Sequence, residues 1–200
     1  MYYAVSDGHN LPYNPFKAIV APRPIGWISS LGADGSINLA PYSFFNAVAA
    51  EPPIVMFSSD GRKDSLANVE QSKEFTCNFV GEKLLYEMSK TSQMVPSDVN
   101  EFELAGLEAA QCEQIKAPRV LGAYAVLECK VTTIMQQKDI EGAKTNHWTV
   151  FGQVVGVHIE EEVLTDGRFD LTKAKPVARL GYRDYTVVRD IFELKRPDQI

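Results

Sequence analysis

Short runs of apolar and β-branched residues, separated by Gly and Pro, dominate the pattern along this chain. Runs rich in Val, Ile, Phe and Thr are typical of β-strands, and Gly and Pro are typical of the turns between them. Gly35 can adopt a positive φ, so the polar stretch around it favours a hairpin turn after the first run. The predicted strands are residues 25–31, 54–58, 75–80, 124–135 and 148–159.

Helical spacing of apolar residues is confined to a few short stretches. Residues 64–71 and 82–90 carry apolar side chains at helical spacing, and residues 97–104 fit a short helix or a loop. Residues 166–176 are expected to form a surface loop. Many short strands with few helices predict a mainly β fold, a barrel with peripheral helices. No linker-like segment divides residues 1–200, so one domain is expected.

Composition and charge narrow the classes of partner. The formal net charge of −6 argues against nucleic acid, because a phosphate-binding surface needs an excess of basic side chains. Three widely spaced cysteines without a CxxC pair, and three histidines without an HxH or HExxH pattern, predict neither a disulfide framework nor a metal site. The first residues do not resemble a signal peptide, and no window reaches the ~20 apolar residues of a membrane helix. A cytoplasmic protein without membrane contact is therefore expected.

The first segment that could bind a ligand places Arg23 between two prolines, directly before the strand 25–31. The prolines stiffen the chain, so Arg23 would point in a fixed direction that suits an anion. Side chains alternate along a strand, which puts Trp27 and Ser29 on one face and Ser30 on the other. An aromatic and a hydroxyl on one face can line a flat polar ring. An edge strand with a core tryptophan and solvated serines is the alternative, and composition alone favours it.

The second segment, residues 38–48, mixes aromatic with small polar side chains. A flavin ring needs this mixture, because its xylene edge is apolar and its pyrimidine edge takes hydrogen bonds. A strand in the barrel interior that packs its phenylalanines explains the same composition. The candidate ring contacts in this segment are Ser43, Phe44, Phe45 and Asn46.

The third segment runs from a strand through a glycine turn and a basic pair into the start of a helix. Free amide groups and the positive end of the helix dipole favour an anion at such a point, and the basic side chains add charge. A solvated turn with a simple helix cap is an equally good interpretation. The candidate residues are Ser58, Arg62, Lys63, Asp64 and Ser65. A GxGxxG fingerprint is absent from the sequence, so a Rossmann dinucleotide domain is not predicted.

In their order along the chain, these segments resemble the flavin reductase-like, FMN-binding split-barrel family. The resemblance covers about residues 10–185, and it depends on the ordered set rather than on any one motif. The resembling segments are residues 23–29 (RPIGWIS), 38–46 (NLAPYSFFN), 62–68 (RKDSLAN), 98–107 (DVNEFELAGL), 151–159 (FGQVVGVHI) and 176–181 (PVARLG).

The resemblance implies a homodimer that binds FMN near the subunit interface. It implies ring contacts from residues 43–46 with Ser29 and Ser30 nearby, and phosphate contacts from residues 62–65 with Lys90 as a further candidate. One departure concerns Tyr182, which follows a single glycine where relatives often have a glycine pair. The cofactor carries the chemistry in such proteins, so no catalytic residue is predicted.

The function implied by the resemblance is hydride transfer from NAD(P)H to the flavin, and from there to free flavin, oxygen or an acceptor such as a partner oxygenase or electron-transfer protein. Two alternatives remain open at this level. One is an electron carrier of the flavoredoxin kind, which is reduced by a partner and does not oxidise NAD(P)H itself. The other is a non-catalytic flavin-binding barrel.

Overall fold

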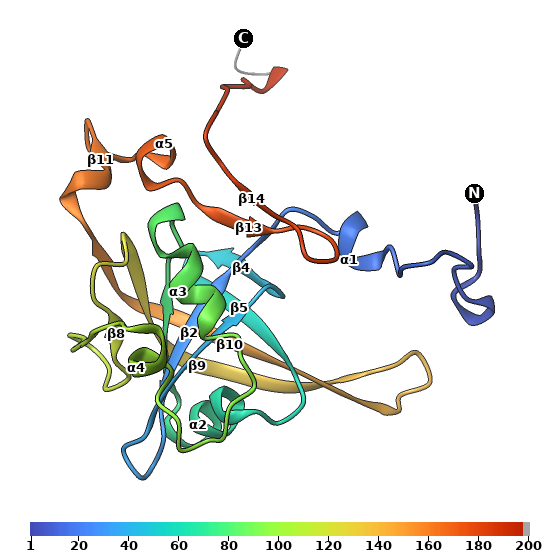
Figure 1. Cartoon of the computed structure of the whole chain (residues 1–200), viewed down its shortest axis with the longest axis horizontal. Coiled ribbons are helices and arrows are strands. Elements are labelled where there is room, and N and C mark those ends of the chain that lie inside the picture. Colours follow the sequence, from blue (N-terminus) through green and yellow to red (C-terminus); the bar gives the residue numbers. More distant parts are fainter. Residues whose placement is uncertain (198–200) are drawn as a thin grey trace.

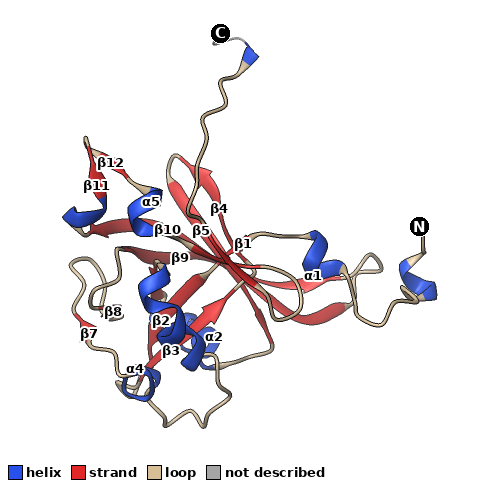
Figure 2. Cartoon of the chain, turned by 45° about the horizontal axis from the view of Figure 1, so that its top comes forward, coloured by secondary structure: helices blue, strands red, loops and turns tan. Residues whose placement is uncertain are grey.

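A seven-stranded antiparallel sheet forms the centre of the molecule in a computed structural model that describes residues 1–197 (Figures 1 and 2). The fold is mainly β, as the sequence predicts. The strand order β3-β2-β6-β9-β10-β5-β4 places strands far apart in sequence next to one another. The strands are β2 (Gly26–Leu31), β3 (Ile37–Tyr42), β4 (Phe45–Ala50), β5 (Pro53–Asp60), β6 (Glu74–Asn78), β9 (Ala125–Lys138) and β10 (Lys144–Ile159).

All five predicted strands are present, and the turn after β2 forms the predicted hairpin, with Gly35 at φ 87°. The segment 38–48 is itself strand, because β3 and β4 occupy all of it except a short link. β9 and β10 pair along most of their lengths, and their hairpin reaches beyond the rest of the sheet in Figure 1. A register shift adjoins Gly152 of β10, where a Cβ atom would lie within 2.5 Å of the Phe75 ring. Glycine therefore allows β6 to pack closely against β10.

Three small sheets surround the large one. β1 pairs with β13, which pairs with β14, and this ties the chain before β2 to the C-terminal part. The predicted surface loop 166–176 is wrong in part, because it contains a short strand and a one-turn helix. The short strands are β1 (Arg23–Pro24), β7 (Ala109–Ala110), β8 (Arg119–Val120), β11 (Leu164–Thr165), β12 (Arg168–Phe169), β13 (Val177–Arg179) and β14 (Tyr185–Val187).

The helices are short and lie around the sheet (Figure 2). The two predicted helices form, although the second begins with a 3-10 turn at Glu82–Leu84. The acidic stretch 97–104 becomes helical only from Glu101, because the Asn100 side chain accepts a hydrogen bond from Phe102 N (3.0 Å) and caps the helix there. The α-helices are α1 (Phe16–Ile19), α2 (Asp64–Ser72), α3 (Leu85–Lys90), α4 (Glu101–Ala105) and α5 (Leu171–Ala174).

Two clusters of buried apolar side chains pack on either side of β2. Trp27 belongs to one cluster with Leu39 and Phe102, and its neighbour Ile28 belongs to the other with Phe57. Both faces of β2 are therefore buried, which makes it a central structural strand. Within residues 1–197, none of the helices has the length and apolar character needed to span a membrane.

Candidate functional site

A cavity of about 1100 Å³ opens where α1, β4 and β5 meet the β9–β10 hairpin. This size and its mostly apolar lining are typical of a site for an organic cofactor. The apolar side chains include Phe16, Ile19, Val20, Phe44, Phe45, Val48, Met56 and Phe151. The polar ones include Arg23, Ser43, Asn46, Ser58, Gln137, Thr145, His147 and Thr149.

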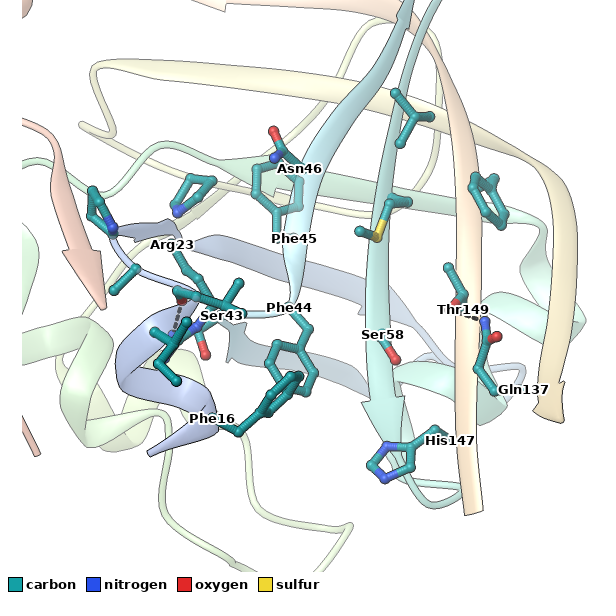
Figure 3. A pocket seen from close by; sticks show the side chains of 18 of the residues that line it. Phe16, Arg23, Ser43, Phe44, Phe45, Asn46, Ser58, Gln137, His147 and Thr149 are labelled. Carbon is teal, nitrogen blue, oxygen red and sulfur yellow. Dashed lines mark hydrogen bonds between the residues drawn. The ribbon is translucent and has the colours of Figure 1, made fainter. Parts of the chain in front are cut away.

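A second cavity of about 740 Å³ lies next to the larger cavity and is more polar. The two cavities share five lining residues, so one extended molecule could occupy both. Figure 3 shows the aromatic side chains from α1 and the β3–β4 link on one side, and polar side chains from β5 and β10 on the other. The shared residues are Phe16, Ser43, Phe44, Ser58 and His147.

The short link between β3 and β4 positions two of these shared residues. The Phe44 carbonyl accepts a hydrogen bond from Ser58 N (2.8 Å), which fixes the link against β5. Phe45, the first residue of β4, covers Gly26 of β2 so closely that a Cβ atom there would overlap the ring. These two contacts hold Ser43 and Phe44 where they line both cavities. The predicted ring contacts from residues 43–46 require such a position.

The N-terminus of α2 forms one wall of the second cavity. Lys63 precedes the helix, Asp64 begins it, and both line the cavity together with Ser65. Within residues 1–197, no side chain caps this helix, so amide groups of its first turn remain available. The buried Ser65 hydroxyl accepts a hydrogen bond from Asn38 Nδ2 (2.7 Å), which fixes its position. This wall combines free amides, a hydroxyl and a lysine.

Two further groups set the electrostatics of the second cavity. Burial raises the pKa of Tyr42, so its phenol stays neutral at physiological pH. Burial also raises the pKa of Glu101, with a smaller contribution from the charge of Asp64, although Leu39 N donates to its carboxylate (3.1 Å). Lys63 and the free amides of α2 offset the charge of Asp64 beside them, so an anion is better placed there than beside Glu101.

Arg23 borders the larger cavity, but its guanidinium is occupied by the protein itself. It donates to the carbonyls of Lys17 and Val20, and to Leu180 O at 2.7 Å, and it lies 6.0 Å from the centre of the Phe44 ring. Arg23 is buried, and within residues 1–197 only its Nε lacks a hydrogen-bond partner among its buried polar atoms. The structure therefore gives Arg23 the role of fixing α1 to the cavity wall, whereas the sequence suggests an anion contact.

The structure does not bring Trp27, Ser29 or Ser30 to either cavity. All three side chains are fully buried in the core. The Trp27 indole donates to Thr91 Oγ1 (2.9 Å), and Ser30 accepts from Asn68 Nδ2 (3.2 Å). The structural alternative for this segment is right about the core tryptophan. It is wrong about an edge strand with solvated serines, because β2 lies between β3 and β6 and both of its faces are buried.

Arg62 and Lys90 also lie outside the two cavities. Arg62 forms an ion pair with Glu70, with Nη1 3.0 Å from Oε1, and its guanidinium is 5.6 Å from the centre of the Trp148 ring. Lys90 is the exposed last residue of α3, and the residues directly after it line the second cavity instead. Of the basic residues predicted to contact phosphate, the structure places only Lys63 at a cavity.

Sequence analysis missed the contributions of α1 and the β9–β10 hairpin to the site. For His147, beside Trp148, the sequence allows a place in a site but favours a structural histidine. The structure puts His147 at both cavities, and within residues 1–197 its imidazole has no hydrogen-bond partner. Thr149 accepts from Gln137 Nε2 (2.6 Å) at the wall of the larger cavity (Figure 3). Phe16 belongs to a helix of four residues, too short for a periodic signal. In the sequence, the polar residue Thr149 inside the apolar run 148–159 was the available sign that this strand lines a site.

Comparison with known proteins assigns the family. The sequence model described as the Flavin reductase like domain matches residues 20–182. The chain therefore belongs to the flavin reductase-like family, and its fold is the split barrel of these proteins. The predicted fold class is confirmed.

The relatives cover nearly the whole chain. An uncharacterized protein of Aquifex aeolicus is 37% identical over 186 residues, which are 90% of this chain and 91% of that protein. Component B of nitrilotriacetate monooxygenase from Bacillus cereus is 28% identical, with a TM-score of 0.89 over 97% of this chain and 98% of that one. The 2-nitrobenzoate 2-nitroreductase of Pseudomonas fluorescens is also 28% identical, with a TM-score of 0.86 over 100% of this chain and 98% of that one.

The cavities fit the cofactor class that the family implies. An aromatic and amide-bearing wall suits a flavin ring, and the adjoining polar cavity suits its side chain. Family membership and this arrangement support flavin binding and a flavin-related oxidoreductase role.

The placement of Trp27 in the core predicts that Trp27→Phe affects stability rather than flavin binding. Losing the hydrogen bond to Thr91 and part of the ring volume should lower the free energy of unfolding by about 1–3 kcal/mol. The affinity of the folded protein for flavin should stay within about twofold, because Trp27 lines neither cavity. A tenfold change would need a difference of about 1.4 kcal/mol. Urea unfolding and flavin fluorescence titration measure the two quantities. A tenfold loss of flavin affinity with unchanged stability would place Trp27 in the flavin site.

Proposed function

We propose that the protein binds FMN with its ring in the larger cavity and its phosphate in the second. The five residues shared by the two cavities carry this proposal, because they connect an apolar aromatic space to a polar one. Phe44 and His147 would flank the passage between the cavities. Ser43, Ser58 and Asn46 would offer hydrogen bonds to the ring, which agrees with the expected contacts from residues 43–46.

The phosphate in this proposal lies at the N-terminus of α2. Lys63 supplies a full positive charge, and the uncapped first turn supplies amide donors beside the Ser65 hydroxyl. Phosphate at a helix N-terminus is favoured by these amides and by the helix dipole. Arg62 adds no direct contact, since its guanidinium pairs with Glu70.

Lys63→Ala is expected to weaken FMN binding roughly tenfold, because one hydrogen bond to a charged group is lost. Riboflavin, which has the same ring but no phosphate, should bind the variant and the parent protein equally well. Quenching of flavin fluorescence measures both affinities.

Arg62→Ala is the matched control, because it removes the adjacent charge from outside the cavity. Its FMN affinity should stay within about twofold of the parent value, well below a tenfold effect. An FMN loss in Arg62→Ala that equals or exceeds the loss in Lys63→Ala would place the phosphate elsewhere.

The reaction proposed for this site is hydride transfer from NAD(P)H to flavin, with onward transfer to free flavin, oxygen or a partner protein. Bound FMN would supply the redox chemistry, and the residues of the chain would bind and orient it. The open larger cavity supports this, because a second flat molecule could reach a ring held there. Similarity to component B of a monooxygenase favours a partner oxygenase as the acceptor.

Anaerobic stopped-flow mixing of the FMN-loaded protein with NADH, and separately with NADPH, tests the reaction. A reductase should bleach the flavin absorbance rapidly with at least one of the two donors. No bleaching with either, together with reduction by a partner electron-transfer protein, would replace the reductase by a flavoredoxin-like carrier. Resistance to every physiological donor would leave only a non-catalytic flavin-binding barrel.

A homodimer is proposed because the rim of the larger cavity is apolar and exposed. Ile19 is 73% exposed, Phe16 58%, Val48 49% and Val20 48%, and these side chains lie together around one opening. Contiguous exposed apolar surface of this kind is typical of a protein interface. β4 adds an exposed edge strand to the same face.

Light scattering coupled to gel filtration should give twice the mass of one chain. Val48→Asp, which places a charge on the rim, should shift the protein to one chain without unfolding it. A parent protein that runs as a monomer at all concentrations would contradict the dimer.

A further inference from the structure

Three side chains with metal-ligating atoms meet on the sheet away from the two cavities. Cys112 lies in the connection between β7 and β8, Glu128 lies on β9, and His158 lies on β10. Their ligating atoms all lie within 4.8 Å of one another. Spacing along the chain hides this cluster, because the three residues are 16 and 30 positions apart. The expectation of no metal site depended on that spacing alone.

The register of β9 and β10 brings the carboxylate and the imidazole together. Glu128 pairs with Gly156, and His158 pairs with Val126, so Glu128 and His158 are diagonal neighbours on the two strands. His158 Nε2 lies 2.5 Å from Glu128 Oε1. A Cβ atom on Gly156 would lie 3.1 Å from Glu128 Cδ, so the glycine leaves the space in which the carboxylate sits.

Glu128 is a fully buried carboxylate. Its two oxygens accept hydrogen bonds from Glu113 N (2.9 Å) and Gln114 N (2.7 Å). Within residues 1–197, no lysine or arginine forms an ion pair with Glu128. A buried negative charge without a permanent cation is unfavourable, and a metal ion would neutralise it.

Cys112 supplies the soft ligand of the cluster. Cys112 is a free, half-buried cysteine, and its sulfur lies within 4.8 Å of the ligating atoms of Glu128 and His158. A divalent metal would take this sulfur as a thiolate, because coordination removes the thiol proton.

We propose that Cys112, Glu128 and His158 bind one zinc ion. Thiolate, imidazole and carboxylate are the ligands that Zn²⁺ takes in proteins, at distances of about 2.0–2.3 Å. Such distances put ligand atoms roughly 3.5 Å apart in a tetrahedral site, so modest side-chain movement from the present spacing suffices. The metal replaces the proton between His158 and Glu128. The imidazole is partly exposed, so water supplies the fourth ligand.

The zinc site lies far from the two cavities, so the metal would not take part in chemistry there. Glu128 is nine residues from Gln137 along β9, or about 30 Å at the rise of an extended strand. The cavity residues Gln137 and His147 therefore lie toward the opposite end of the same hairpin. Zinc would join the connection that contains Cys112 to the two longest strands of the sheet, where the amides of Glu113 and Gln114 already bind Glu128.

Metal binding by the full chain, loaded with flavin, tests this site. After treatment with a chelator, the protein is titrated with ZnCl₂ in competition with a chromophoric zinc indicator. It should bind one zinc ion per chain, and zinc should raise its melting temperature. CoCl₂ in place of zinc should produce a thiolate-to-cobalt charge-transfer absorption.

Cys112→Ser and His158→Gln should each weaken zinc binding at least about tenfold, the scale on which metal-site residues act. Cys112→Ser should also abolish the cobalt–thiolate absorption, and zinc should no longer raise the melting temperature of either variant. Glu113→Gln is the matched control, because it removes an exposed carboxylate next to Cys112 but keeps its backbone amide. It should bind zinc as the parent does.

Three results would overturn the site: a parent protein that binds less than one zinc ion per chain, a Cys112→Ser variant that keeps the parent affinity, or a cobalt spectrum without a thiolate band. Because two ligands are removed separately, a folding defect in one variant leaves the other as a test. The readouts are metal content and spectra, so the outcome does not depend on the flavin site.

Discussion

The antiparallel pairing of β9 with β10 holds the two halves of the seven-stranded sheet together. These two strands are the longest in the chain, and they connect β6 on one side to β5 on the other. Gly152 permits the close contact with Phe75 that joins the two halves of the sheet. Without this pairing, the half that contains β2 and β3 would have no connection through the sheet to the half that contains β4 and β5.

The two cavities result from how other elements meet this hairpin. β10 carries His147 and Thr149, and β5 beside it carries Ser58. The β3–β4 link brings Phe44 to the same place, where its carbonyl bonds Ser58 N. Rigid strands thus position the polar groups, whereas short irregular segments supply the aromatic wall. A split barrel can bind a flat cofactor in this way without a dedicated dinucleotide-binding domain.

The sequence predicts the strands well because alternation and β-branched composition report local structure directly. It also predicts the link around Phe44 and the helix start around Lys63. It assigns Trp27 and Arg62 differently, because burial of the second face of β2 and the ion pair with Glu70 depend on tertiary contacts. Strand register brings His147, Glu128 and His158 to their neighbours, and the connection between β7 and β8 brings Cys112; spacing along the chain encodes neither.

A crystal structure of the protein with FMN would show whether the cofactor spans the two cavities. Electron density for the ring is expected between Phe44 and His147, and for the phosphate beside Lys63 at the start of α2. Ring density elsewhere on the molecule, or a phosphate bound at Arg62 or Lys90 outside the cavities, would contradict this placement.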